Sequence, residues 1–297
     1  MNRIAITGSS GLIGAALRER LSTDRREVVR AFRGNESDPS ALWNPEKGWV
    51  KPGAFADCDA IVHLAGASVG EGRWSEARKR ELVSSRVDAT RVLIDHLATL
   101  PQRPKVFVTA SGAGFYGDRG DEVLTEESAK GTGFLADLVE AWERETSRAA
   151  EFGMRVVQLR FGVILAKQGG ALKKLLLPFK LGAGGPIGGG KQYMALVSLD
   201  DAVGAIIFAL DHEISGAFNV VTPQPATNAD FTKALGKAVH RPAVVPMPGF
   251  AMRLILGAEQ ANEMILGGQR VLPRRLEAAG FTFQHSDVSA ALASALA

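Results

Sequence analysis

Short apolar segments alternate with longer segments of helical periodicity over the first half of the chain. The apolar runs at 4–7, 28–32, 60–64, 106–109 and 155–159 are typical of buried strands. Between them, apolar residues recur at helical spacing over 11–21, 75–100 and 134–152. Strands that alternate with helices form βαβ units, in which helices cover both faces of a parallel sheet. The pattern therefore predicts an α/β fold with a doubly wound parallel sheet.

The alternation changes after Leu165. Ser198, followed by two aspartates, predicts the start of a helix, and 217–221 is typical of a late strand of the sheet. From Asn228 onward, short helical segments are separated by prolines. We expect a first domain of residues 1–165, completed by about 193–227. A smaller, mostly helical substrate lobe is expected over 166–192 and 228–297.

A glycine-rich motif lies between the first predicted strand and the first predicted helix. It has the form G-x-x-G-x-x-G, which permits a tight turn, close approach of backbone to a pyrophosphate, and close packing of helix on strand. The free N–H groups at the helix start can bind the phosphates. Its position between a strand and a helix supports a Rossmann dinucleotide site, whereas the alternative is a glycine-rich turn without a ligand. The predicted cofactor-binding residues are Gly8, Ser10, Gly11, Leu12, Ile13 and Gly14.

The end of the second predicted strand indicates the type of cofactor. An NAD site has an acid there, about 20 residues after the glycines, to hold the ribose 2′-hydroxyl. This chain has Ala31-Phe32-Arg33-Gly34 instead. Because a guanidinium suits a 2′-phosphate, we predict that Arg33 binds that group and that the cofactor is NADP(H). The alternative is that Arg33 ends the strand in solvent.

Composition and charge limit the classes of partner. The net charge is only +3, and acids interrupt the basic tract 73–91, so we expect no nucleic-acid partner. The single cysteine, Cys58, cannot form an intramolecular disulfide, which fits a reducing cytosol. The strongest apolar stretch, 202–210, is shorter than the roughly 20 residues that cross a bilayer. We expect a cytoplasmic protein with a small-molecule substrate, no membrane partner and no metal site, and the oligomeric state stays open.

Further motifs extend along nearly the whole chain. Together with the glycine motif, Leu64-Ala65-Gly66 and Ser111-Gly112-Ala113-Gly114-Phe115-Tyr116-Gly117 make the chain resemble an extended short-chain dehydrogenase/reductase. The segments 184–188, 199–201 and 266–273 resemble an atypical branch of the NAD-dependent epimerase/dehydratase proteins. Members of that branch are often labelled sugar-nucleotide epimerases or SulA-like cell-division inhibitors. The resemblance implies an NADP(H)-dependent oxidoreductase or epimerase for a small polar substrate such as a nucleotide sugar, with Leu64, Ala65 and Gly66 at the cofactor.

The chain departs from ordinary extended enzymes at the catalytic pair Tyr-x-x-x-Lys. Residues 128–153 contain one lysine, Lys130, and no tyrosine. Ser111 matches the catalytic Ser/Thr of the family, although a hydroxyl that only forms a turn is the alternative. Tyr116 is a candidate phenol, although an aromatic residue in such a loop more often lines a pocket. Arg86, where the extended family usually has an asparagine, is a candidate to bind an anion, with a surface arginine as the alternative.

Other titratable residues complete the set of candidates. Glu126 and Glu127 lie in the loop after Tyr116 and are candidate acid/base groups, although a place as acids in the first turn of a helix explains them as well. His63, on an apolar strand, is expected to be a hydrogen-bonded core residue. If no group replaces the missing pair, the alternative function is a non-catalytic NADP(H) sensor or regulatory protein.

Overall fold

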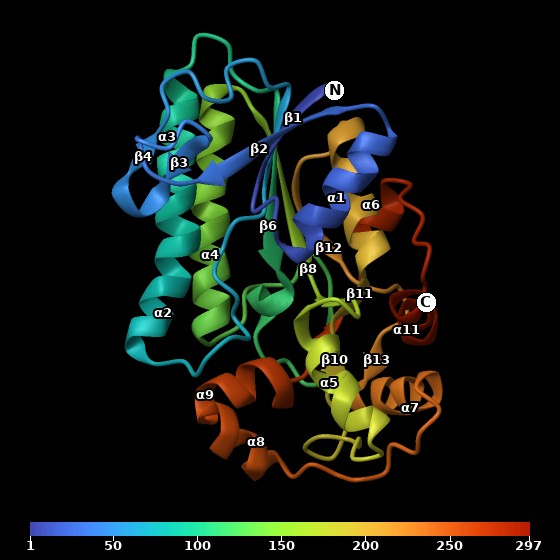
Figure 1. Ribbon diagram of the computed structural model, residues 1–297. Coiled ribbons are helices and arrows are strands. Elements are labelled where there is room, and N and C mark those ends of the chain that lie inside the picture. Colours follow the sequence, from blue (N-terminus) through green and yellow to red (C-terminus); the bar gives the residue numbers. More distant parts are fainter.

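The computed structural model describes residues 1–297 and contains one eight-stranded sheet (Figure 1). Its strands are β1 (Arg3–Thr7), β2 (Glu27–Arg33), β3 (Ala41–Asn44), β4 (Trp49–Val50), β5 (Ala60–His63), β6 (Val106–Gly112), β8 (Arg155–Phe161) and β12 (Gly216–Val220). Their order is β12-β8-β6-β5-β1-β2-β3-β4. All neighbours pair in parallel except β3 and β4, which are antiparallel. The predicted Rossmann-type sheet is confirmed, and β3 and β4 extend it beyond the predicted strands.

Helices cover both faces of the sheet (Figure 1). On one face, α1 (Leu12–Thr23) and α6 (Leu199–Asp211) bury a core that includes Ile4 and Ile6. On the other face, α3 (Ala89–Thr99) packs over a core that includes Ala5. Since successive side chains of a strand point to opposite faces and both faces are covered, the central strands carry apolar residues on both faces.

The predicted helix over 75–100 has an irregular middle. It consists of α2 (Glu76–Val83), a π-helical turn at Ser84–Asp88, and α3. The hydroxyl of Ser75 caps it by accepting from the backbone N–H of Arg78 at 3.2 Å. A π-helical turn inserts one extra residue and is frequently found at functional sites. The turn here contains Arg86, one of the candidate residues.

A third core lies among α5 (Gly170–Lys180), α7 (Asn228–Ala238) and α11 (Val288–Leu296), away from the large sheet. Three short strand pairs accompany these helices: β9 (Val163–Leu165) with β11 (Leu196–Ser198), β10 (Tyr193–Met194) with β13 (Ala226–Thr227), and β7 (Val123–Leu124) with β14 (Arg270–Val271). Three shorter helices of the C-terminal part are α8 (Gly249–Leu256), α9 (Ala258–Ala261) and α10 (Arg274–Ala278). The boundaries of the two predicted domains stay a prediction.

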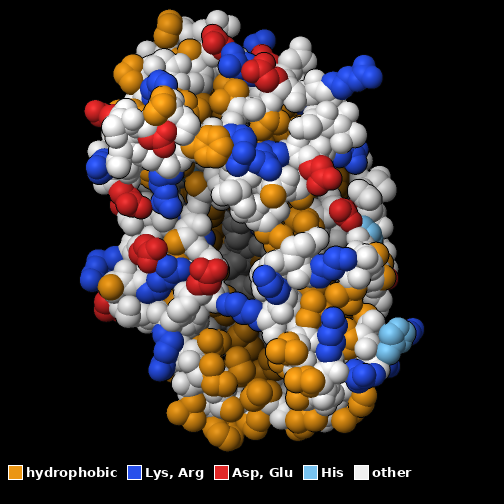
Figure 2. Space-filling view, in the orientation of Figure 1, with side chains coloured by type: hydrophobic (Ala, Val, Ile, Leu, Met, Phe, Trp, Pro, Cys, Tyr) orange, Lys and Arg blue, Asp and Glu red, His pale blue; other side chains and the backbone are white.

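Hydrogen bonds from the segment that begins at α9 connect the C-terminal helices to α4 (Phe134–Ser147) and to the chain around Trp74. Both carboxylate oxygens of Glu263 accept from the backbone at the start of α4, from the N–H groups of Phe134 and Leu135, each at 2.8 Å. A carboxylate is favourable there because a helix N-terminus carries partial positive charge. Gln260 adds a hydrogen bond from Trp74 N–H at 3.3 Å. Figure 2 shows a hollow in the surface between the upper and lower parts of the molecule.

Candidate functional site

The glycine motif forms a tight turn between β1 and α1. Gly8 has a φ of +67°, and a Cβ there would lie 2.7 Å from the backbone carbon of Leu64. A Cβ on Gly14 would lie 2.3 Å from the carbonyl oxygen of Gly8. Both positions therefore need glycine for close backbone packing. This packing brings the glycine loop against the segment 64–66, so two of the predicted cofactor segments lie side by side.

The N-terminus of α1 is free to receive a ligand. Its N-cap residue, Gly11, makes no side-chain cap, and the first turn contains no acid. A Cβ on Gly11 would meet only the carbonyl oxygen of Gly8, at 3.3 Å. The chain itself therefore requires glycine here less strongly than at Gly8 or Gly14. Uncapped N–H groups and positive partial charge are what a pyrophosphate needs.

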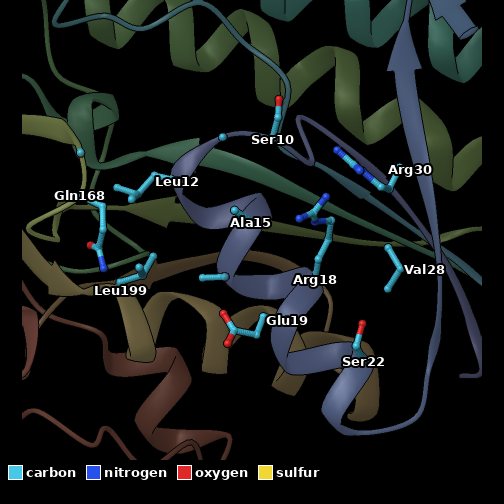
Figure 3. A pocket seen from close by; sticks show the side chains of 13 residues that line it. Ser10, Leu12, Ala15, Arg18, Glu19, Ser22, Val28, Arg30, Gln168 and Leu199 are labelled. Carbon is cyan, nitrogen blue, oxygen red and sulfur yellow. The ribbon is translucent and has the colours of Figure 1, made fainter.

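Ser10 and Leu12, also predicted at the cofactor, line a cleft beside α1 (Figure 3). The cleft continues along α1 and β2, where Arg18 and Arg30 also line it. Ile13 packs partly buried against the first core. Of the predicted glycine-loop residues, Ser10, Gly11 and Leu12 thus line one cleft. Contact of the loop with a cofactor stays a prediction.

Arg33 lies on the opposite face of β2 from this cleft. Val28 and Arg30 line the cleft, whereas Ala31 packs in the core of the other face. Side chains alternate along a strand, and Arg33 accordingly shares the face of Ala31. Its side chain is 61% exposed and pairs with Glu46 at 3.2 Å. The role of Arg33 at a 2′-phosphate stays a prediction.

Arg86 lies directly against the segment after β5. A Cβ on Gly66 would be 3.2 Å from the Cζ of Arg86, and the guanidinium lies 5.3 Å from the ring centre of Trp142. Arg86 has no acidic partner; its one hydrogen bond, to the carbonyl of Leu82, is 3.4 Å long. Burial, together with the nearby charge of Arg78, lowers the pKa of Arg86 to about 10. A half-buried cation without a counter-ion beside the cofactor segment fits the predicted anion-binding role, which stays a prediction.

A chain of buried polar side chains connects β6, α4, β8 and β12. The hydroxyl of Ser111 donates to Glu143 Oε1 at 2.6 Å. Arg160 holds the same carboxylate with two hydrogen bonds, Nε to Oε1 at 2.8 Å and Nη2 to Oε2 at 2.7 Å. Its Nη1 donates to the hydroxyl of Tyr116 at 3.0 Å, and that hydroxyl donates to Asn219 Oδ1 at 2.8 Å. Ser111 and Tyr116, predicted as a pair, are thus joined through Glu143 and Arg160.

Tyr116 has no exposed surface. Burial raises the pKa of its phenol, against the opposing effect of the Arg160 charge. Both hydrogen-bonding partners of the hydroxyl belong to the protein. The catalytic role of Tyr116 stays a prediction, and complete burial of the side chain argues against direct contact with a substrate.

Of the remaining candidates, Glu126 and His63 have structural partners. Glu126 Oε1 accepts from the backbone N–H groups of Asn219 at 3.0 Å and Arg275 at 3.2 Å, and Glu127 is exposed. His63 is fully buried between the hydroxyls of Thr7 at 2.7 Å and Thr90 at 3.1 Å. Burial lowers the pKa of His63 to about 4, so the ring is neutral. The prediction of a hydrogen-bonded core histidine is confirmed.

Sequence reasoning missed several polar residues of this region. Arg160 is a charged residue near the end of the predicted strand at 155–159, and a charge in a buried strand requires a partner. That is the signal that could have identified it. Glu143 had a weaker signal, since it lies on the same helical face as the apolar Val139. Nothing local indicated that Glu263 would reach the N-terminus of α4.

These features define a class of protein, a dinucleotide-binding Rossmann protein with a helical lobe. The model of the NAD dependent epimerase/dehydratase family matches residues 4–220. A Domain of unknown function (DUF1731) matches residues 247–295. The chain therefore belongs to the NAD dependent epimerase/dehydratase family, and the predicted resemblance is confirmed.

Similar proteins cover the whole chain. An epimerase family protein of Mycobacterium leprae is 42% identical over 98% of this chain and 95% of its own length. The crystal structure of human epimerase family protein SDR39U1 with NADPH has a TM-score of 0.88 and 33% identity, and covers 99% of both chains. A nucleoside-diphosphate sugar epimerase from Corynebacterium glutamicum has a TM-score of 0.80 and 35% identity over 99% of this chain and 58% of its own.

None of the helices has the length and apolar character needed to span a bilayer. No three His, Cys, Asp or Glu side chains gather in a way that would hold a metal ion.

Proposed function

We propose that this protein is an NADP(H)-dependent oxidoreductase or epimerase that acts on a small polar substrate, with a nucleotide sugar as the first candidate. The observation that carries the proposal is the uncapped, acid-free N-terminus of α1, formed by the glycine loop, together with a β2 end that has Phe32 and Arg33 in place of an acid. The NADPH in the crystal structure of the human relative supports the cofactor, and the name of the Corynebacterium relative, a nucleoside-diphosphate sugar epimerase, supports the substrate class.

The cofactor would supply the hydride chemistry. The glycine loop and the first turn of α1 would hold its pyrophosphate, and Gly66 and Arg86 would lie along its other half. Ser111 lies near the carboxyl end of β6, the edge of a parallel sheet where ligands bind. Because its proton is directed at Glu143, its oxygen presents lone pairs that can accept from a substrate hydroxyl. Ser111 would therefore orient a polyhydroxy substrate, and Tyr116 would act on it only through Arg160 and Glu143.

A second candidate function, an NADP(H) sensor without turnover, is favoured by one specific observation. The only tyrosine near Ser111 is fully buried, and α4 has neither a tyrosine nor a lysine. Without a positioned proton donor, an enzyme of this kind loses about 10²–10⁴-fold in rate. The sensor would keep the cofactor site and lack the proton route.

The test combines binding and turnover on the purified protein. NADPH and NADH are titrated by calorimetry, and NADPH oxidation and NADP⁺ reduction are followed with carbonyl compounds, sugar alcohols and nucleotide sugars. Once a substrate is found, Ser111→Ala should lower kcat or raise KM, with Ser84→Ala, an exposed serine, as the matched control. Tight NADPH binding without turnover on any substrate would favour the sensor. Failure to bind either cofactor would refute both functions.

A further inference from the structure

A cleft of about 950 Å³ lies on the outer side of α1 (Figure 3). One wall is α1, with Gly11 at its start, and another is β2, with Val28 and Arg30. Leu199, at the start of α6, lies on the far side. The cleft therefore begins at the predicted pyrophosphate site and runs along β2, the strand beside which the adenosine half of a dinucleotide binds.

Two arginines enter this cleft from different elements. Arg18 comes from the second turn of α1 and Arg30 from the middle of β2, and Figure 3 shows their guanidinium groups pointing toward each other below Ser10. Neither forms an ion pair, and the Nε of each is buried without a hydrogen-bond partner. Glu19 also lines the cleft but does not pair with either arginine.

Two neighbouring arginines, one on α1 and one just before β2, have acidic partners. Arg20 pairs with Asp24 at 3.6 Å, and Arg26, just before β2, pairs with Asp211 at 2.7 Å. Two adjacent cations without an acid repel each other, and buried N–H groups without acceptors are costly. An anion with several oxygens between the two guanidiniums removes both costs. A phosphate is well suited, since it accepts paired hydrogen bonds from the planar fork of arginine.

The position of the two arginines distinguishes between the phosphate groups of a dinucleotide cofactor. Arg18 lies seven residues after Gly11, about 10 Å along the helix, so a group between the arginines is separate from a pyrophosphate at the first turn. The guanidinium of Arg30 also lies 4.3 Å from the ring centre of Phe32, which stands where an NAD site has its acid. This contact holds the guanidinium plane at the end of β2.

We propose that Arg18 and Arg30 bind the 2′-phosphate of NADP(H) and set the preference for it over NAD(H). This assignment rests on the proposed function, and it moves the main 2′-phosphate contact from Arg33 to the two arginines of the cleft. Arg33 points away from the cleft and already has Glu46 as its partner.

The experiment measures the affinities of NADPH, NADH, 2′,5′-ADP and 5′-AMP by calorimetry. The variants are Arg18→Gln, Arg30→Gln and Arg33→Gln, with Arg20→Gln on the exposed side of the same helix as the control. Loss of a charge-assisted contact corresponds to about 10- to 150-fold in affinity. We expect Arg18→Gln and Arg30→Gln each to lose that factor for NADPH and 2′,5′-ADP, and to keep wild-type affinity for NADH and 5′-AMP. Arg33→Gln and Arg20→Gln should change each affinity less than threefold, roughly.

The outcomes separate this assignment from the proposed function. A wild-type preference for NADPH that Arg33→Gln abolishes, and that the two cleft variants retain, would overturn the assignment and leave the function intact. Equal losses of affinity for NADPH and NADH in the cleft variants would also overturn the assignment, because the two arginines would then not discriminate between a 2′-phosphate and a 2′-hydroxyl. A wild type that binds neither cofactor would refute the function itself.

Chemical modification of the wild type tests the same assignment without any variant. Phenylglyoxal modifies arginines, and the modified positions are mapped by mass spectrometry. We expect 2′,5′-ADP to protect Arg18 and Arg30, and 5′-AMP to protect them less. Protection of Arg33 alone would overturn the assignment.

Discussion

Replacing Arg160 by methionine should destabilise the protein strongly, because the change leaves a carboxylate buried without its counter-ion. Arg160 and Glu143 are 5% and 9% exposed, and two hydrogen bonds of 2.8 and 2.7 Å join them. Removal of one partner of a buried ion pair costs about 3–5 kcal/mol. Arg160 also donates to the buried phenol of Tyr116 and lies 3.5 Å from the ring centre of Phe115. The loss should therefore fall in the upper part of that range.

The assay is urea unfolding together with thermal unfolding of Arg160→Met. For a chain of this size, 1 kcal/mol shifts Tm by about 2 °C, so Tm should fall by about 6–10 °C. Arg148→Met is the matched control. The Arg148 side chain pairs with Glu145 and Asp95 but is 34% exposed, against 6% for Arg160. Because Glu145 keeps Arg91 as a second partner, loss of Arg148 should cost only about 0–1 kcal/mol.

The double variant distinguishes loss of a pair from loss of packing. Glu143→Met alone should also destabilise strongly, since it leaves Arg160 buried and unpaired. The double variant Glu143→Met/Arg160→Met removes both charges, so its cost should be smaller than the sum of the single costs by at least about 2 kcal/mol. Additive costs, or a loss for Arg160→Met no larger than for Arg148→Met, would refute the view that this network is a coupled buried ion pair.

Three further variants test the glycine loop, the buried histidine and the helix cap. Gly11→Val should abolish cofactor binding and leave the circular dichroism spectrum unchanged, because its side chain would stand where backbone must approach the pyrophosphate; wild-type NADPH affinity would contradict this. His63 has a pKa of about 4 in the folded protein, so the unfolded chain takes up the proton first as the pH falls. The neutral form of His63 therefore contributes fully to the free energy of unfolding above pH 6.5, and this contribution decreases by about 3 kcal/mol towards pH 4. His63→Gln should remove this part of the pH dependence in urea unfolding. An unchanged dependence of the free energy of unfolding on pH would contradict the prediction. Glu263→Gln should weaken the cap of α4 and lower stability by about 1–2 kcal/mol, and a thermal midpoint equal to the wild type would show that the two N–H contacts contribute nothing.

Local patterns in the sequence were sufficient to predict the parallel sheet, the turn formed by the glycine motif and the type of cofactor. The alternation of apolar strands and amphipathic helices depends on residues close together in the chain, since each element must present its own apolar side to the core. The glycine motif is also local, because its turn and the helix start lie within seven residues, Gly8 to Gly14. The absence of an acid at the end of β2, and of Tyr-x-x-x-Lys on α4, is likewise visible in a short stretch of sequence.

Only the tertiary structure decided which polar groups face one another. The ion pair between Glu143 and Arg160 joins a helix to the next strand, and Tyr116 bonds to Asn219, which is 103 residues further along the chain. Glu263 caps α4 from 129 residues beyond Phe134. Arg18 and Arg30 meet because α1 packs beside β2, whereas Arg33 points to the other face of the same strand. These pairings depend on sheet order and helix packing, which bring distant segments together, so no local pattern in the sequence encodes them.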